Sequence, residues 1–206
     1  MPILFKKSIN DTVSYLVWEI SESEDELLSH LNLNDEEWSD FDRIKVGIRR
    51  LEWLGARTAL KHLVKEIGQF YIFKDGFGKP HLRDSNIGIS ISHTKGFGAA
   101  AINLNGPIGI DIEHPRQQIL KIAHKFLHDS EKSWAGKSVE HLTKIWAAKE
   151  ALYKLHGRTQ LTFAEQLIIS NVNLDKPAGS IIESNISRTY KLAYNSVLGL
   201  ELCCSY

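Results

Sequence analysis

Apolar residues recur along this chain with two different periods. Spacings of three and four residues predict helices over about 44–68, 116–127 and 138–156. Alternation, or short apolar runs between turn residues, predicts strands instead. The predicted strands are 13–20, 87–94, 97–104, 106–113, 167–174, 179–187, 188–196 and 198–206. Because helices and groups of strands follow one another without strict alternation, the pattern is typical of an α+β protein.

Local signals add detail to this pattern. The segment 21–31 begins with Ser21 and has Glu24 three residues on, a pair that predicts the capped start of a helix. Gly and Pro in 74–80 predict a turn. Each half of the chain has helix first and several strands afterwards, without a strict sequence repeat. We therefore expect two similar α+β halves, 1–104 and 105–206.

Composition restricts the kinds of partner. Among 206 residues, 25 Lys and Arg balance 25 Asp and Glu, so no global charge attracts nucleic acid or an anionic membrane. No stretch resembles a signal peptide, and no run of about 18 apolar residues predicts a membrane span. The adjacent Cys203 and Cys204 suit a reducing compartment and lack the spacing of a zinc site. We expect a cytoplasmic protein without nucleic-acid or membrane partners, in which any anion site is local.

Two carboxylates stand at the end of an apolar strand. Asp111 and Glu113 are two apart in "GIDIE", and residues two apart on a strand point to the same side. Such a pair favours a cation between the charges, and carboxylate oxygens suit magnesium, which completes its shell with water and phosphate. A strand end that faces solvent explains the pair as well, so the pair alone leaves both interpretations open.

The segment "IWAAKEALYKLHG" (145–157) adds a third carboxylate. On a helix, Trp146, Lys149, Glu150 and Lys154 fall on one side, and aliphatic residues fill the rest. Glu150 and Lys154 are four apart, so ordinary surface pairing also explains them. Beside the strand carboxylates, however, the set suggests a metal with phosphate oxygens around it and lysines that act as point charges on phosphate.

Basic and polar residues of the first half are further candidates, each with a structural alternative. Arg50 and Arg57 lie about 10 Å apart on one face of the predicted helix, where long side chains also simply cover apolar surface. Lys79 lies in "GFGKP", where glycines leave backbone amides open to an anion, although this is not a nucleotide-binding P-loop. Ser92 and His93 end a predicted strand.

These motifs, in this order, resemble the 4′-phosphopantetheinyl transferases of the larger, surfactin-synthetase-activating type. The matching stretches are "FGKP" (77–80), "ISISHTKG" (89–96), "GIDIE" (109–113), "FLHDSE" (126–131) and "WAAKEALYK" (146–154). The resemblance implies a pseudo-dimeric fold of two similar α+β halves, with the active site at their junction, in a chain that acts as a monomer. It also implies the reaction of a holo-[acyl-carrier-protein] synthase. In that reaction phosphopantetheine moves from coenzyme A to a serine of an apo acyl or peptidyl carrier protein, and adenosine 3′,5′-bisphosphate is released.

The resemblance also implies a role for individual residues. The first half, 1–104, would contribute to coenzyme A binding, and the second would carry the metal motifs. Magnesium would be held by Asp111, Glu113 and Glu150. Catalytic roles would fall to Glu150, Glu131 and Lys154, and the proton acceptor is left open between Glu131, Glu150 and water. Coenzyme A would be bound by Arg50, Arg57, Lys79, Ser92, His93, Asp111, Lys149 and Lys154.

Two surface features bear on the substrates. Where members of this type often have a basic cluster before the first long helix, this chain has "NDEEWSDFD" (34–42), so other residues would have to hold the 3′-phosphate. The substitutes are Arg43, Lys45 and Arg49. The predicted helix before Glu131 offers a basic face to the acidic helix that carrier proteins present, with an ordinary solvated helix as the alternative. Its basic residues are Arg116, Lys121, Lys125 and Lys132.

Two other kinds of function would use the same residues. Another magnesium-dependent phosphotransferase or nuclease would also need three carboxylates, but the chain lacks a basic and aromatic stripe for nucleic acid. A non-catalytic module that binds coenzyme A or a carrier protein would tolerate loss of the acidic set, which is present in full. The kind of carrier, and the choice between magnesium and manganese, do not follow from the residues.

Overall fold

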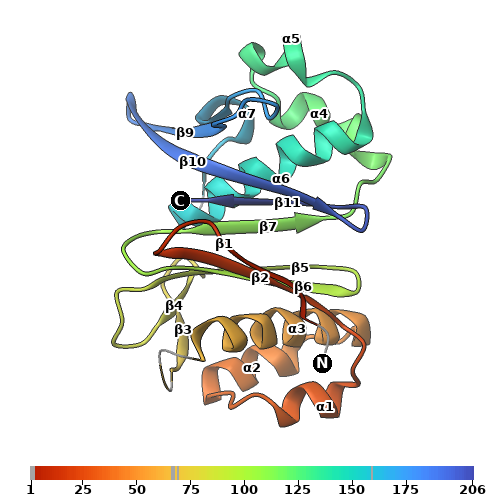
Figure 1. Ribbon diagram of the computed structural model, residues 1–206, viewed down its shortest axis with the longest axis vertical. Coiled ribbons are helices and arrows are strands. Elements are labelled where there is room, and N and C mark those ends of the chain that lie inside the picture. Colours follow the sequence, from red (N-terminus) through yellow and green to blue (C-terminus); the bar gives the residue numbers. More distant parts are fainter. Residues whose placement is uncertain (1–2, 66–67, 69, 159) are drawn as a thin grey trace. The chain divides into compact units, whose positions relative to one another are not determined.

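Two long helices of this chain each pack on an antiparallel sheet of their own. In the computed structural model of Figure 1, the described residues are 3–65, 68, 70–158 and 160–206. They form two units, Met1–Ile108 and Gly109–Tyr206, each with its own apolar core. The sequence pattern predicts the division a few residues earlier, between 104 and 105.

The first unit contains a four-stranded sheet covered by helix α3 (Gly47–Val64). The strands, in order across the sheet, are β1 (Ile3–Ser8), β2 (Val13–Glu19), β6 (Phe97–Asn103) and β5 (Gly88–Thr94). Helix α3 packs against β2, β5 and β6, and Leu60 lies in one buried cluster with Trp18 and Ile89. At Gly98 the helix comes so close that a Cβ would lie 2.3 Å from Ala56 N, so no other residue fits there without a shift of the helix.

Shorter elements complete the first unit, and one differs from its prediction. They are α1 (Glu24–Ser29), α2 (Asp35–Arg43), β3 (Ile72–Lys74) and β4 (Pro80–Leu82). Helix α1 begins later than the pattern predicts, because Ser23 and Glu26, not Ser21 and Glu24, form its capping box. The carboxylate of Glu24 instead contacts Arg50.

Helix α2 is not predicted from the apolar pattern, because its segment is mostly acidic. Its start is nevertheless encoded locally: Asn34 is the N-cap and forms a capping box with Glu37. Phe41 is its buried apolar anchor, and it clusters with Leu27 of α1 and Leu54 of α3. A buried aromatic and a cap therefore mark this short helix, although it lacks a continuous apolar side.

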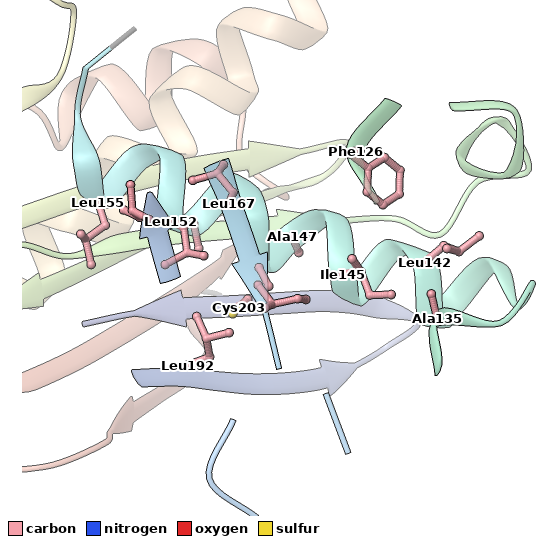
Figure 2. Packing of buried hydrophobic residues seen from close by; sticks show 14 of the residues in the cluster. Phe126, Ala135, Leu142, Ile145, Ala147, Leu152, Leu155, Leu167, Leu192 and Cys203 are labelled. Carbon is pink, nitrogen blue, oxygen red and sulfur yellow. The ribbon is translucent and has the colours of Figure 1, made fainter. Parts of the chain in front are cut away.

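The second unit contains a five-stranded sheet and helix α6 (Val139–His156). The strands, in order across the sheet, are β7 (Gly109–Glu113), β11 (Leu200–Ser205), β10 (Ile186–Val197), β9 (Ala178–Glu183) and β8 (Leu167–Ile169). The other helices are α4 (Gln118–Phe126), the 3-10 turn η1 (Asp129–Glu131), α5 (Lys132–Ala135) and α7 (Phe163–Gln166). Figure 2 shows the aliphatic side of α6, with Ile145 and Leu152, among buried residues of the sheet such as Leu192 and Cys203.

The two units share a pattern of connections. In each unit, a strand (β2 or β7) precedes the long helix (α3 or α6). The last strand of the unit (β6 or β11) pairs antiparallel with that first strand. The strand before the last (β5 or β10) pairs with the other edge of that last strand. The predicted fold class is therefore confirmed: the chain is α+β, with separate sheets. None of the helices in the described part of the chain is long and apolar enough to cross a membrane.

Candidate active site

Strand β7 places two carboxylates against helix α6. Gly109, at the start of the strand, faces α6 so closely that a Cβ would lie 1.8 Å from Ala151 O. Residues two apart on a strand share a face, so Asp111 and Glu113 lie on the same, helix-covered side. Asp111 is buried, and Glu113, at the end of the strand, is half-buried.

Side chains of α6 meet these carboxylates. Lys154 Nζ lies 2.7 Å from Asp111 Oδ1 and donates a hydrogen bond to it. Glu150 stands one turn earlier, where the charges of Asp111 and Lys154 act on it. The side chain of Trp146 hydrogen-bonds to Glu113. The structure thus gathers four of the residues that the sequence singles out, and adds Trp146 as a partner.

Burial and mutual repulsion determine the charge of this site. The pKa of Glu113 is raised to about 7, first by burial and then by the negative charge of Asp111. The pKa of Glu150 is also raised to about 7, by the same two causes in the same order. Near neutral pH both carboxyl groups are therefore close to the midpoint of their titration, and a nearby cation would favour their ionised forms.

The acidic residues are neighbours, but they are not arranged as a metal centre. Among the described residues, no group of three or more His, Cys, Asp or Glu side chains could hold a metal ion as placed. The ammonium group of Lys154 supplies the positive charge beside Asp111. The donor set itself fits magnesium, because it offers hard carboxylate oxygens whose repulsion a divalent cation would relieve. The magnesium assignment stays a prediction.

Glu131 and Lys149 lie in the interior of the second unit. Both side chains are fully buried, and Lys149 Nζ is 2.7 Å from Glu131 Oε2. A contact of Glu131 with a carrier serine, or of Lys149 with coenzyme A, would require this pair to become accessible, and both assignments stay predictions. A sequence motif shows that a charged residue is present, but it does not show whether that charge is buried.

The two arginines of α3 are also engaged within the protein. Arg57 is buried, its Nε donates to Glu37 at 3.1 Å, and its guanidinium lies 3.2 Å from the Trp53 ring centroid. Arg50 forms an ion pair of 2.6 Å with Glu24 and covers the ring of Phe41. Both therefore fasten α1 and α2 to α3, and the structure does not support their assignment to coenzyme A.

In the turn at 74–80, a carboxylate of the turn itself binds the backbone amides. The carboxylate of Asp75 accepts hydrogen bonds from the backbone amides of Phe77 at 2.9 Å and Lys79 at 3.0 Å. These amides, which the sequence leaves open to a phosphate, are thus occupied by Asp75. The side chain of Lys79 is half-buried, and its pKa is lowered to about 8 chiefly by burial, although Asp75 opposes the shift.

Ser92 and His93 point to opposite sides of β5, because they are consecutive on a strand. Ser92 is buried, whereas His93 is exposed and its Nδ1 lies 3.3 Å from Glu52 Oε2. The two are therefore not a joint phosphate clamp in this arrangement, and coenzyme A binding by either stays a prediction.

The possible substitutes for the missing basic cluster are also engaged. Arg49 is 2.8 Å from Glu52, and Arg43 is 3.7 Å from Asp40. Lys45 donates to the backbone oxygen of Asp42 at 2.8 Å. The three basic groups are exposed, and exposed ion pairs exchange partners at little cost in free energy. The assignment of Arg43, Lys45 and Arg49 to the 3′-phosphate stays a prediction.

Some partners of the site residues escape sequence reasoning, for different reasons. Trp146 is one turn before Glu150, so its place on the site side of α6 follows from helical spacing, but its bond to Glu113 requires the packed structure. Asp75 is detectable, because Asp followed by Gly is a common turn that binds its own backbone. Glu37 as the partner of Arg57 has no local signal, since the two are 20 residues apart.

Comparisons with known proteins point to the same class. Residues 107–202, which contain the acidic residues of β7 and α6, match the model of the 4'-phosphopantetheinyl transferase superfamily. The chain is also similar to the 4'-phosphopantetheinyl transferase gsp of Aneurinibacillus migulanus, with 30% identity over 139 residues. This match covers 62% of the present chain, and the chain spans 57% of the length of that relative. The resemblance found in the motifs is thereby confirmed.

Proposed function

We propose that this protein transfers 4′-phosphopantetheine from coenzyme A to a serine of an apo acyl or peptidyl carrier protein, as a holo-[acyl-carrier-protein] synthase. The observation that carries the proposal is the gathering of Asp111, Glu113, Glu150 and Lys154 on β7 and α6. All four lie in the range that matches the transferase superfamily. The name of the Aneurinibacillus relative supports the same reaction.

The charge of the site suits a pyrophosphate substrate once a metal is present. Asp111, Glu113 and Glu150 would hold magnesium, which, when bound, neutralises charge on the transferring phosphoryl group and on the leaving bisphosphate. Lys154 would contribute a second positive charge from the end of α6, where its ammonium group already lies among the carboxylates. The released product would be adenosine 3′,5′-bisphosphate.

The carrier serine must lose its proton during attack, and the candidate acceptors are Glu131, Glu150 and water. Burial of Glu131 and its pairing with Lys149 argue against Glu131 as the acceptor. Glu150 is half-buried and lies beside Asp111 and Lys154, at the site where the pyrophosphate would bind. We assign this role to Glu150 or to a water molecule that it orients.

The coenzyme A contacts in the first unit are a proposal of their own. Lys79, Ser92 and His93 would bind its phosphates, as the resemblance implies. A lysine whose pKa is lowered to about 8 by burial gains most from a phosphate partner, because the anion restores the charged form. We further propose that the protein acts as a cytoplasmic monomer.

A reaction with coenzyme A, magnesium and an apo carrier protein tests the function directly. We expect the intact mass of the carrier to increase by one phosphopantetheine group, and a carrier whose acceptor serine is replaced by alanine to stay unchanged. Binding of coenzyme A without any mass gain would favour a binding module. Hydrolysis of coenzyme A or of nucleic acid without a modified carrier would favour another phosphotransferase or a nuclease.

A further inference from the structure

A fully buried ion pair connects helix α6 to the segments that pack around it in the second unit. Lys149 Nζ lies 2.7 Å from Glu131 Oε2, and neither side chain has any exposed surface. The same ammonium group donates to Phe163 O at 3.1 Å and to Leu167 O at 2.6 Å. An ammonium group has three donors, so these three acceptors use all of them.

The carboxylate of Glu131 is equally engaged. Its Oε1 accepts a hydrogen bond from the backbone amide of Ile169 at 2.8 Å, and its Oε2 accepts one from His128 at 2.8 Å. Together, Glu131 and Lys149 join four segments: α6, the η1 turn, the start of α7 and strand β8. A buried charge with this many partners is stable in place, but removal of one partner leaves the other charge uncompensated.

The position of Lys149 on α6 links this pair to the candidate active site. Lys149 immediately precedes Glu150, and consecutive helical residues are about 100° apart around the axis. Anchoring of Lys149 toward α7 and β8 therefore sets the rotation at which Glu150 and Lys154 face β7. Any rotation that moved Glu150 or Lys154 away from Asp111 would have to pull the Lys149 ammonium group away from its three acceptors.

We infer that Glu131 and Lys149 are positioning residues, which fix the rotation of α6 so that Glu150 and Lys154 face the carboxylates of β7. The inference rests on the proposed function, and it assigns the pair no contact with substrate. It replaces the expectation that Glu131 accepts a proton from the carrier serine. No proton transfer through Glu131 is required, because its oxygens are directed at Lys149 and at backbone amides.

Removal of one charge and then of both distinguishes the two roles. In Glu131→Gln or Lys149→Met, one charge stays buried alone, so we expect the melting temperature to fall by roughly 10 °C. We expect the amides of α6 to lose protection from hydrogen exchange, and transfer, assayed well below melting, to slow by about tenfold or more. The double variant Glu131→Gln with Lys149→Met leaves no uncompensated charge. It should recover much of the melting temperature, but a methionine at position 149 donates no hydrogen bond, so the protection of α6 and the transfer rate should stay reduced while the pH profile keeps its wild-type shape.

A pair on the same helix provides the matched control. Lys144 of α6 lies 3.9 Å from Glu201, at a site where the lysine is one-third exposed. Lys144→Met and Glu201→Gln, alone and together, should change α6 exchange and transfer much less than the buried pair does.

Three outcomes would overturn the inference. A folded double variant with normal α6 protection that transfers about 100-fold more slowly would make Glu131 the proton acceptor. Single variants with wild-type exchange and transfer would show that the pair does not position α6. A double variant with wild-type protection of α6 would do the same, even if the wild-type protein transferred nothing and the proposed function had failed on its own test.

Discussion

At the scale of single residues, carboxyl groups of the candidate site repel one another when they are ionised. Burial and the charge of Asp111 raise the pKa of both Glu113 and Glu150 to about 7, above the ordinary range for glutamate. A group whose pKa is raised on folding keeps its proton in the folded state after the unfolded chain has released it. The metal-free protein should therefore lose stability through these two groups as the pH rises from about 4.5 to about 7.

A comparison of unfolding at two pH values tests this effect. Metal-free Glu150→Gln, which cannot ionise, should gain stability relative to the wild type at about pH 8, up to an upper limit of roughly 3 kcal/mol, and little at about pH 5. Glu165 of α7 is exposed, so Glu165→Gln is the matched control. It should change the free energy of unfolding little at either pH. Magnesium should stabilise the wild type more than Glu150→Gln at the higher pH. A difference between wild type and Glu150→Gln that is the same at both pH values would contradict the electrostatic account.

At the scale of elements, helical spacing in the sequence predicts the face of α6 that carries the site, but not every residue on it. Helices α3, α4 and α6, strand β2 and the strands from β5 onward follow from periodicity or from short apolar runs. Helix α2 does not, since one buried aromatic and a capping box form it without such a side. Lys149 illustrates a second limit of sequence patterns, which do not show whether a charged side chain is buried. Its charge assigns it to the polar side of α6, whereas the fold buries it completely.

Helix α4 is the element that we expect to meet the carrier protein. Lys121 and Lys125 are exposed and four residues apart on it, and the exposed Arg116 precedes it. The charge of Lys132 is offset by Asp129 at 2.7 Å, so this residue contributes less than the sequence suggests. An acidic carrier helix would therefore be attracted mainly by α4 itself.

Charge reversal on α4 tests this docking surface. Lys121→Glu with Lys125→Glu should raise the KM for the carrier several-fold at low salt, reduce its salt dependence and leave the KM for coenzyme A nearly unchanged. Lys6→Glu with Lys7→Glu, two exposed residues of β1, makes the same change in net charge elsewhere and is the matched control. Equal effects of the two double variants would show a response to net charge and rule out docking on α4.

At the scale of the whole molecule, the chain contains two α+β units with the same order of connections. This similarity is predictable from the sequence of helices and strands, although no residue-level repeat accompanies it. We expect the protein to act as a monomer. Sedimentation of the active protein should give the mass of one chain at every concentration that supports transfer. Activity that is lost on dilution together with a dimer or trimer would refute this expectation.

The central claim is that the acidic residues of β7 and α6 perform the transfer, and the intact mass of a carrier protein tests it most directly. With coenzyme A and limiting magnesium, we expect the wild-type protein to convert the apo carrier, and Asp111→Ala and Glu150→Ala to leave it unmodified while retaining their fold by circular dichroism. The control Lys144→Met, on the same helix as Glu150 but outside the site, should convert the carrier as the wild type does. Conversion by either acidic variant at close to the wild-type rate would contradict the account.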